Sequence, residues 1–130
     1  MMFSLANLQE LKENIPMKSG TYRIIWIKNG NPQKIRRFLG DDPTGLVYIG
    51  RTKGSLLTRL KQFGASAFLG SSNHSAGNKY KRYKVLNSHV KPSELKVEFK
   101  VESPNKAVNS EKAQIKKYAK HFGEVPPLNG

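Results

Sequence analysis

Residues 21–27 (TYRIIWI) restrict the fold more than any other segment of this chain. They are mostly β-branched or aromatic, a composition that is typical of a strand. Because their apolar side chains fall on both alternating faces, we expect a central strand with packing on its two sides. Such a strand predicts an α/β (α+β) domain in which helices flank a small sheet.

Two more segments have the pattern of a strand. Residues 46–50 (LVYIG) are apolar and end in glycine, and residues 94–101 alternate charged with apolar side chains. Apolar residues at helical spacing predict the remaining elements, which are a leading helix within residues 1–19, a helix at 55–63, a helix around Tyr80, Tyr83 and Leu86 that follows a loop at 64–78, and a last helix at 106–122. We therefore expect a small, mostly antiparallel, three-stranded sheet flanked by helices.

The 130 residues contain no internal repeat and no dividing linker, so we expect one domain over residues 1–130. Residues 28–45 form an insertion with strong turn signals between the first two strands. Four cations make this insertion a candidate DNA-contacting arm, with a solvated hairpin as the alternative. They are Lys28, Lys34, Arg36 and Arg37.

The charge is strongly basic, with 23 Lys and Arg against 9 Asp and Glu and a formal net charge of +14. Cations that neutralise phosphates release counterions, so nucleic acid is the expected partner. A membrane partner is not expected because no apolar run approaches the roughly 20 residues of a span. The absence of cysteine and of a signal-peptide pattern favours a cytoplasmic location.

Glu111 is a candidate for chemistry because it lies within the apolar stripe of the predicted last helix. It follows Val108 by three residues and precedes Ile115 by four. A carboxylate on that face needs a basic partner, a proton or a cation, since burial of an unpaired charge is costly. The alternative is a glutamate near the helix start that the helix dipole stabilises.

Tyr22 and Tyr48 are each close to a glycine at the end of a predicted strand, where a phenol can be held rigidly in a cleft. Their alternative role is ordinary packing. Arg59 interrupts a leucine-rich helix at the edge of its apolar stripe, from which its side chain either enters the site or extends to solvent.

Gly20-Thr21-Tyr22 followed by Tyr48-Ile49-Gly50 resembles the two-part signature of the GIY-YIG nuclease superfamily. The middle residue Thr21 and the long insertion between the two motifs depart from the common pattern. Further matches follow in order along the chain, and they are Arg51-Thr52, Arg59-Leu60, Asn73-His74-Ser75, Glu111 and Pro127-Leu128-Asn129. The resemblance is to a stand-alone, single-domain member of that superfamily.

The resemblance implies a DNA endonuclease that leaves 3′-hydroxyl and 5′-phosphate ends. In that family the glutamate holds one divalent cation, which makes Glu111 the expected ligand of Mg²⁺ or Mn²⁺. The arginine binds the reacting phosphate, a role that falls to Arg59. The tyrosines orient or deprotonate the attacking water, and Tyr22 is our first candidate for the general base.

By the same resemblance, Tyr48 and His74 are expected near the water or phosphate, and Asn129 is expected to support the site. Without the resemblance, His74 would read as a loop residue with no chemical task. Arg51 is a candidate phosphate contact beside the second motif. The predicted basic helix adds two more candidate nucleic-acid contacts, Lys79 and Arg82.

Two other functions remain open at this point. The first is a binding module that grips DNA or RNA on the same fold without cutting it. The second is an RNA-binding structural protein, such as a ribosome-associated one, which would account for the charge alone. Cleavage specificity, biological role and the choice between monomer and homodimer do not follow from the sequence.

Overall fold

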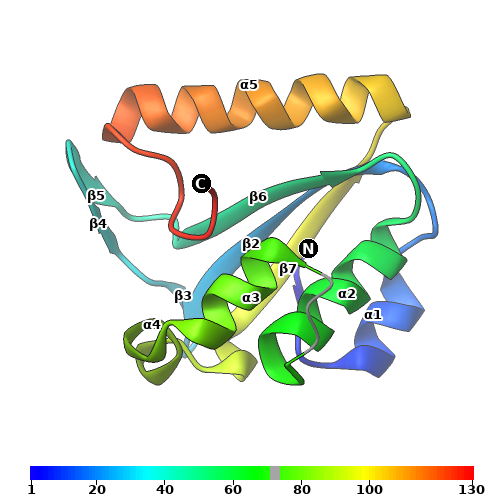
Figure 1. Cartoon of the computed structure of the whole chain (residues 1–130), viewed down its shortest axis with the longest axis horizontal. Helices are drawn as coiled ribbons and strands as arrows, with labels where there is room; N and C mark the ends of the chain where they lie inside the picture. The colour runs from blue at the N-terminus through cyan, green and yellow to red at the C-terminus, as the bar shows by residue number, and fades with distance from the viewer. Residues whose placement is uncertain (71–73) are drawn as a thin grey trace.

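The computed structural model describes residues 1–70 and 74–130, and it has a mixed α+β fold as expected (Figure 1). In chain order the elements are β1 (Phe3–Ser4), α1 (Leu8–Asn14), β2 (Gly20–Lys28), β3 (Asn31–Pro32), β4 (Ile35–Arg37), β5 (Gly40–Asp42), β6 (Leu46–Thr52), α2 (Leu56–Phe68), α3 (Ser75–Arg82), α4 (Lys84–His89), a 3₁₀ turn (Pro92–Glu94), β7 (Leu95–Val101) and α5 (Pro104–Phe122).

The central strand of the sheet is β2, as the two-sided apolar pattern predicts. It pairs antiparallel with β6 on one side and β7 on the other, so that Tyr22 lies opposite both Gly50 and Phe99. The expected three-stranded sheet is therefore present. Two short strands that the sequence analysis missed extend it, because β1 pairs with β7 and β3 pairs with the end of β2.

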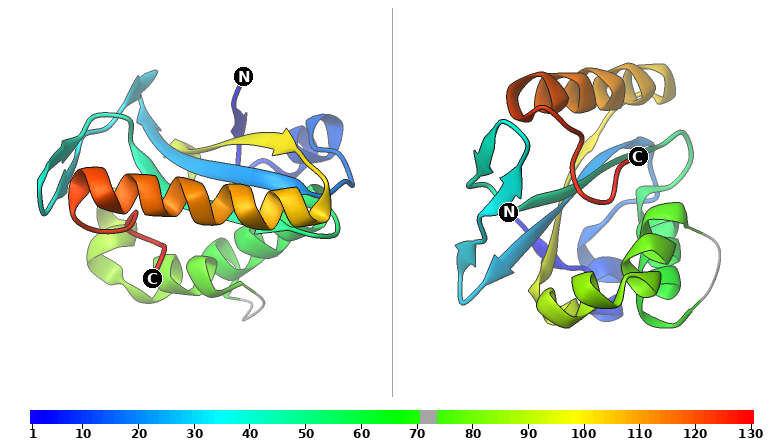
Figure 2. Two further views of the ribbon diagram at one scale, coloured as in Figure 1. Left: turned by 90° about the horizontal axis from the view of Figure 1, so that it is seen from above. Right: turned by 60° about the vertical axis from the view of Figure 1, so that its left-hand side comes forward.

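Helices cover both faces of the sheet. Figures 1 and 2 show α5 along one face and α1, α2 and α3 against the other. Alternate residues of β2 enter the two cores: Tyr22 and Ile24 face α2, and Ile25 packs toward Tyr118 of α5. Within the described ranges no helix combines the length and apolar character that a membrane span requires.

The predicted loop at 64–78 was too long. Helix α2 continues to Phe68, five residues past its predicted end, and α3 begins at Ser75. One of the glycines that signalled a loop, Gly77, instead permits close packing of helices. A Cβ added to Gly77 would lie 2.7 Å from the carbonyl oxygen of Phe63, so α2 and α3 could not approach as they do with a larger residue.

Other element boundaries also differ from those predicted. The basic helix around Tyr80 is two helices, because Tyr83 adopts an extended backbone (φ −86°, ψ 96°) that ends α3 and begins α4. The leading helix occupies only Leu8–Asn14 of residues 1–19. The last helix begins at Pro104, two residues before its predicted start, since proline suits the first turn of a helix.

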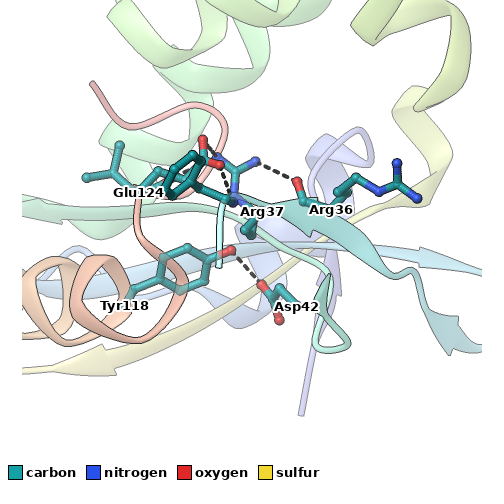
Figure 3. Close-up of polar contacts among 7 residues, drawn as sticks. Arg36, Arg37, Asp42, Tyr118 and Glu124 are labelled. Atoms are coloured by element: carbon teal, nitrogen blue, oxygen red, sulfur yellow. Dashed lines mark hydrogen bonds and ion pairs between the residues drawn. The ribbon is translucent and has the colours of Figure 1, made fainter. Parts of the chain in front are cut away.

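The insertion at 28–45 contains the β4–β5 hairpin, which is anchored to the carboxyl end of α5 (Figure 3). Arg37 donates from Nη2 to Glu124 Oε1 at 2.6 Å and to the Val125 carbonyl at 2.9 Å. Tyr118 donates its hydroxyl to the buried Asp42 carboxylate at 2.8 Å. These contacts anchor one side of the hairpin to the folded domain, while its other side is exposed to solvent.

Candidate active site

Tyr22 and Gly50 pack closely against each other in the sheet at the base of the candidate site. These residues are paired across β2 and β6, and Tyr22 is only 1% exposed. A Cβ added to Gly50 would lie 2.6 Å from the Tyr22 hydroxyl oxygen, which no real side chain could tolerate. Glycine is therefore required at this position, and the Tyr22 ring lies 5.9 Å from that of Tyr48.

His74 connects this pair to the helical layer. It is the N-cap of α3, and its buried ring packs 4.6 Å from Phe63 and 5.6 Å from Tyr48, measured between ring centroids. Its Nε2 lies 2.9 Å from the Tyr22 hydroxyl. The resemblance led us to expect His74 near the water or phosphate, and the fold places it beside Tyr22 and Tyr48.

The surroundings of His74 determine where its proton lies. Burial, reinforced by the positive charge of Arg59, lowers the pKa of His74 from 6.5 to about 3, so the ring is neutral at physiological pH. Its Nδ1 accepts a hydrogen bond from the Gly77 backbone N–H at 3.3 Å. A neutral ring that accepts at Nδ1 carries its proton on Nε2. His74 therefore donates to the Tyr22 hydroxyl oxygen.

The two phenols form the next link of this chain. The two rings lie 5.9 Å apart between centroids, and a hydrogen bond between the phenols acts to raise the pKa of Tyr22 and to lower that of Tyr48. Burial is the main cause that raises the pKa of both tyrosines. Tyr22 is only 1% exposed whereas Tyr48 is partly exposed, so water can reach Tyr48 more readily. The arrangement therefore disfavours Tyr22 as the general base and favours Tyr48.

Arg59 supplies positive charge beside the phenols. It lies in the first turn of α2, where its backbone N–H bonds to the Ser55 carbonyl, and its Nη1 donates to Gln62 Oε1 at 3.0 Å. The guanidinium charge acts to lower the pKa of both Tyr22 and Tyr48. Of the two alternatives for Arg59, entry into the site is the one that the structure supports.

Glu111 approaches the same strand from the other face of the sheet. It lies two turns into α5, beyond the first turn where the helix dipole acts, so the dipole does not account for its position. Its side chain is 19% exposed and contacts Arg51 Nε through Oε1 at 3.5 Å. Burial raises the pKa of Glu111, and its negative charge in turn raises that of Tyr48.

The donor set fits a divalent cation that binds together with substrate. In the described part of the chain no three or more His, Asp or Glu side chains gather as a metal cluster. A lone, partly buried carboxylate is nevertheless a suitable Mg²⁺ ligand when phosphates and waters complete the coordination. The Arg51 contact occupies Glu111 in the free protein and would have to yield to such a cation.

Asn129 positions the outer edge of β6. Its Oδ1 accepts from the Ile49 N–H at 2.9 Å and its Nδ2 donates to the Ile49 carbonyl at 2.8 Å. The adjacent Leu128 donates its N–H to the Val47 carbonyl at 2.9 Å. The side chain of Asn129 thus acts through the backbone beside Tyr48, in keeping with the supporting role expected of it.

The residues expected to contact nucleic acid differ in their exposure to solvent. Most of them project to solvent, namely Lys28, Lys34, Arg36 and Arg82, with Lys79 half-buried on α3. The prediction that Arg37 contacts nucleic acid needs correction, because its side chain is only 11% exposed and is bound to Glu124. Its role is to anchor the hairpin. Asn73, part of the matched loop, lies outside the described residues.

Sequence analysis gave no role to Glu102, which accounts for the unusual Thr21. The Thr21 hydroxyl donates to Glu102 Oε1 at 2.9 Å, and both side chains are buried. Ser19 donates its hydroxyl to the Glu102 carbonyl at 2.6 Å. A hydroxyl in a buried strand needs an acceptor, and this requirement was the signal that could have led to Glu102.

No protein-family model, no curated protein and no solved structure matches this chain.

The assignment of the His74 proton makes a prediction that can be tested by NMR. The ring nitrogens of His74 should keep the signature of the Nε2-protonated, neutral ring between pH 5 and 8. Exposed His89 and His121 provide reference signals in the same spectra. Because the unfolded chain binds this proton near pH 6.5 and the folded chain only near 3, the free energy of unfolding should fall as pH drops below 6.5. A His74 signal that titrates near pH 6.5 would contradict the assignment.

Proposed function

We propose that this protein is a divalent-metal-dependent DNA endonuclease of the GIY-YIG type. The observation that carries the proposal is the convergence of Tyr22, Tyr48, His74 and Arg59 with Glu111 at strand β6. These side chains come from five separate segments of the chain. Packing alone would not require a carboxylate, a guanidinium and two phenols around one edge strand.

The proposed reaction is the hydrolysis of a phosphodiester by water. The water oxygen bonds to phosphorus as the bond to the 3′ oxygen breaks, which leaves a 5′-phosphate and a 3′-hydroxyl. Tyr48 acts as the base in its phenolate form, which a hydrogen bond with Tyr22 favours because it lowers the pKa of Tyr48. The phenolate orients the water, takes its proton and becomes a neutral phenol, and the departing 3′ oxygen takes a proton from solvent. His74 holds Tyr22 in place.

Charge stabilisation comes from both faces of β6. The Arg59 guanidinium offsets negative charge on the phosphate oxygens as the transition state forms. One Mg²⁺ or Mn²⁺ ion bound at Glu111 would supply positive charge at the leaving oxygen. Arg51 exchanges its contact with Glu111 for one with a DNA phosphate when substrate binds.

DNA is the proposed substrate because the net charge of +14 favours a polyanion. The same charge permits a non-cleaving DNA- or RNA-binding module. One observation favours that second candidate, since the ion pair with Arg51 occupies the carboxylate in the free protein. We place the protein in the cytoplasm, because the chain contains no cysteine and disulfides are rare in that compartment.

Plasmid cleavage tests the proposed activity. Wild type should cut supercoiled DNA with Mg²⁺ or Mn²⁺ and lose this activity in EDTA. Glu111→Gln should be slower by about 100-fold or more, because the neutral amide cannot hold the cation. Glu13→Gln is the matched control, an exposed change on α1 that should cut as wild type. Tight DNA binding by a wild type that cuts no substrate with either metal would leave the binding module as the better function.

The division of labour between the tyrosines has a test of its own. Tyr48→Phe should lower kcat by roughly 100-fold or more, the scale of lost proton transfer. Tyr22→Phe should cost less and should shift the pH profile to higher pH, because Tyr48 loses the hydrogen bond that lowers its pKa. A larger loss in Tyr22→Phe than in Tyr48→Phe would return the role of base to Tyr22.

A further inference from the structure

The tip of the β4–β5 hairpin exposes two large apolar side chains. Phe38 is 80% exposed and its neighbour Leu39 is 62% exposed. Single exposed apolar residues are common on protein surfaces, but two adjacent ones at a hairpin tip form a projecting apolar point. Exposed Arg36 and Lys34 precede this point in the chain, and exposed Asp41 follows it, with its carboxylate 4.0 Å from Lys34 Nζ. An apolar point beside Arg36, on a chain of net charge +14, is suited to a ligand that has both anionic and apolar parts.

The tip is held rigidly although it is exposed. The Phe38 N–H donates to Glu124 Oε2 at 2.7 Å, and the Leu39 N–H donates to the Phe122 carbonyl at 2.8 Å. With the Arg37 to Glu124 bond, these contacts fix the strand and the turn against the end of α5. Figure 3 shows Arg36 pointing away from this anchored side. A fixed tip loses little conformational entropy on binding a ligand.

Helix α5 connects the tip to the candidate active site. Exposed lysines recur at four-residue spacing along it, at Lys112, Lys116 and Lys120, and so lie along one side. The helix rises roughly 16 Å between Glu111 and Phe122. At about 3.4 Å per base pair, this length corresponds to roughly five base pairs of duplex.

We propose that Phe38 and Leu39 form a wedge that enters the minor groove of duplex DNA, about five base pairs from the phosphate cut beside Glu111. The inference rests on the proposed function, because it takes DNA as the ligand. Proteins that kink DNA insert Phe and Leu side chains between base steps in this way. The lysines of α5 follow the phosphates between the cut and the wedge.

The surrounding charge favours DNA over a second copy of the chain as the occupant. Two chains of net charge +14 repel one another, which disfavours a contact between copies at the tip. A duplex provides phosphates for Arg36 and Lys34 together with the faces of unstacked bases for Phe38. The apolar tip and Arg36 therefore match the bases and the phosphates of a nucleic-acid duplex.

Binding to a 30-base-pair duplex that contains 2-aminopurine tests the wedge. The full chain carries Glu111→Gln throughout, so that cleavage does not interfere. The parent should raise the 2-aminopurine fluorescence at some labelled positions because a base step unstacks. Adding Phe38→Ser and Leu39→Ser should abolish that rise and weaken binding about tenfold. Leu8→Ser, which removes an exposed apolar side chain from α1, is the matched control and should change neither.

Salt dependence separates the wedge from the phosphate contacts. The wedge variant, which carries Phe38→Ser and Leu39→Ser, should keep the parent's slope of log affinity against log salt concentration. Arg36→Ala should reduce the magnitude of that slope by about one, because one phosphate contact is lost. A parent that carries Phe38→Trp should still unstack the base step, because tryptophan is also a flat aromatic side chain. The fluorescence of the new tryptophan should be quenched when DNA binds. Circular dichroism and thermal unfolding identify any variant that fails to fold, and the Phe38→Trp variant then carries the test.

Three results would overturn the inference. If the wedge variant binds and unstacks DNA as the parent does, the wedge is wrong while the nuclease still stands. If that variant instead changes from dimer to monomer with DNA binding intact, the tip is an interface between copies. If neither the parent nor wild type binds any duplex, the DNA substrate fails as well, and the plasmid assay would show this independently.

Discussion

The contact between Tyr22 and Gly50 is the constraint from which the candidate site follows. The phenol crosses the neighbouring strand where no Cβ fits, so β6 must present glycine there. This packing brings the Tyr22 hydroxyl to His74 at the start of α3 and leaves Tyr48 alongside it. A larger residue at Gly50 would displace the ring and with it the order of the hydrogen bonds. Steric fit in the sheet thus sets the chemistry of the site.

Burial and charge act against each other around β6. Removal from water raises the pKa of both tyrosines and of Glu111, and it keeps His74 neutral. Arg59 and Arg51 offset part of the rise in the pKa of the tyrosines and of Glu111, whereas Arg59 reinforces the effect of burial on His74. A site that keeps its ionisable groups away from their ordinary pKa values stores free energy that a phosphate and a cation can release on binding. Under the proposed function, DNA phosphates would complete the coordination of a cation that Glu111 alone would hold weakly.

The general architecture could be predicted from the sequence because it depends on local patterns. Alternation and apolar runs located the three long strands, and the lone carboxylate in the stripe of α5 singled out Glu111. Contacts between distant residues could not be predicted in this way. Arg37 and Glu124 are 87 positions apart, and nothing in the local sequence pairs them. Gly77 read as a loop signal because its use in helix packing depends on a partner helix.

The most direct measurement of the central claim is the fate of water oxygen during cleavage. A DNA duplex cut in water enriched in the heavy isotope of oxygen can be examined by mass spectrometry of its new ends. Hydrolysis at the β6 site predicts the heavy oxygen on a 5′-phosphate, opposite an unlabelled 3′-hydroxyl, in wild type and not in Glu111→Gln. A label on a 3′-phosphate, or ends that carry none, would contradict the account.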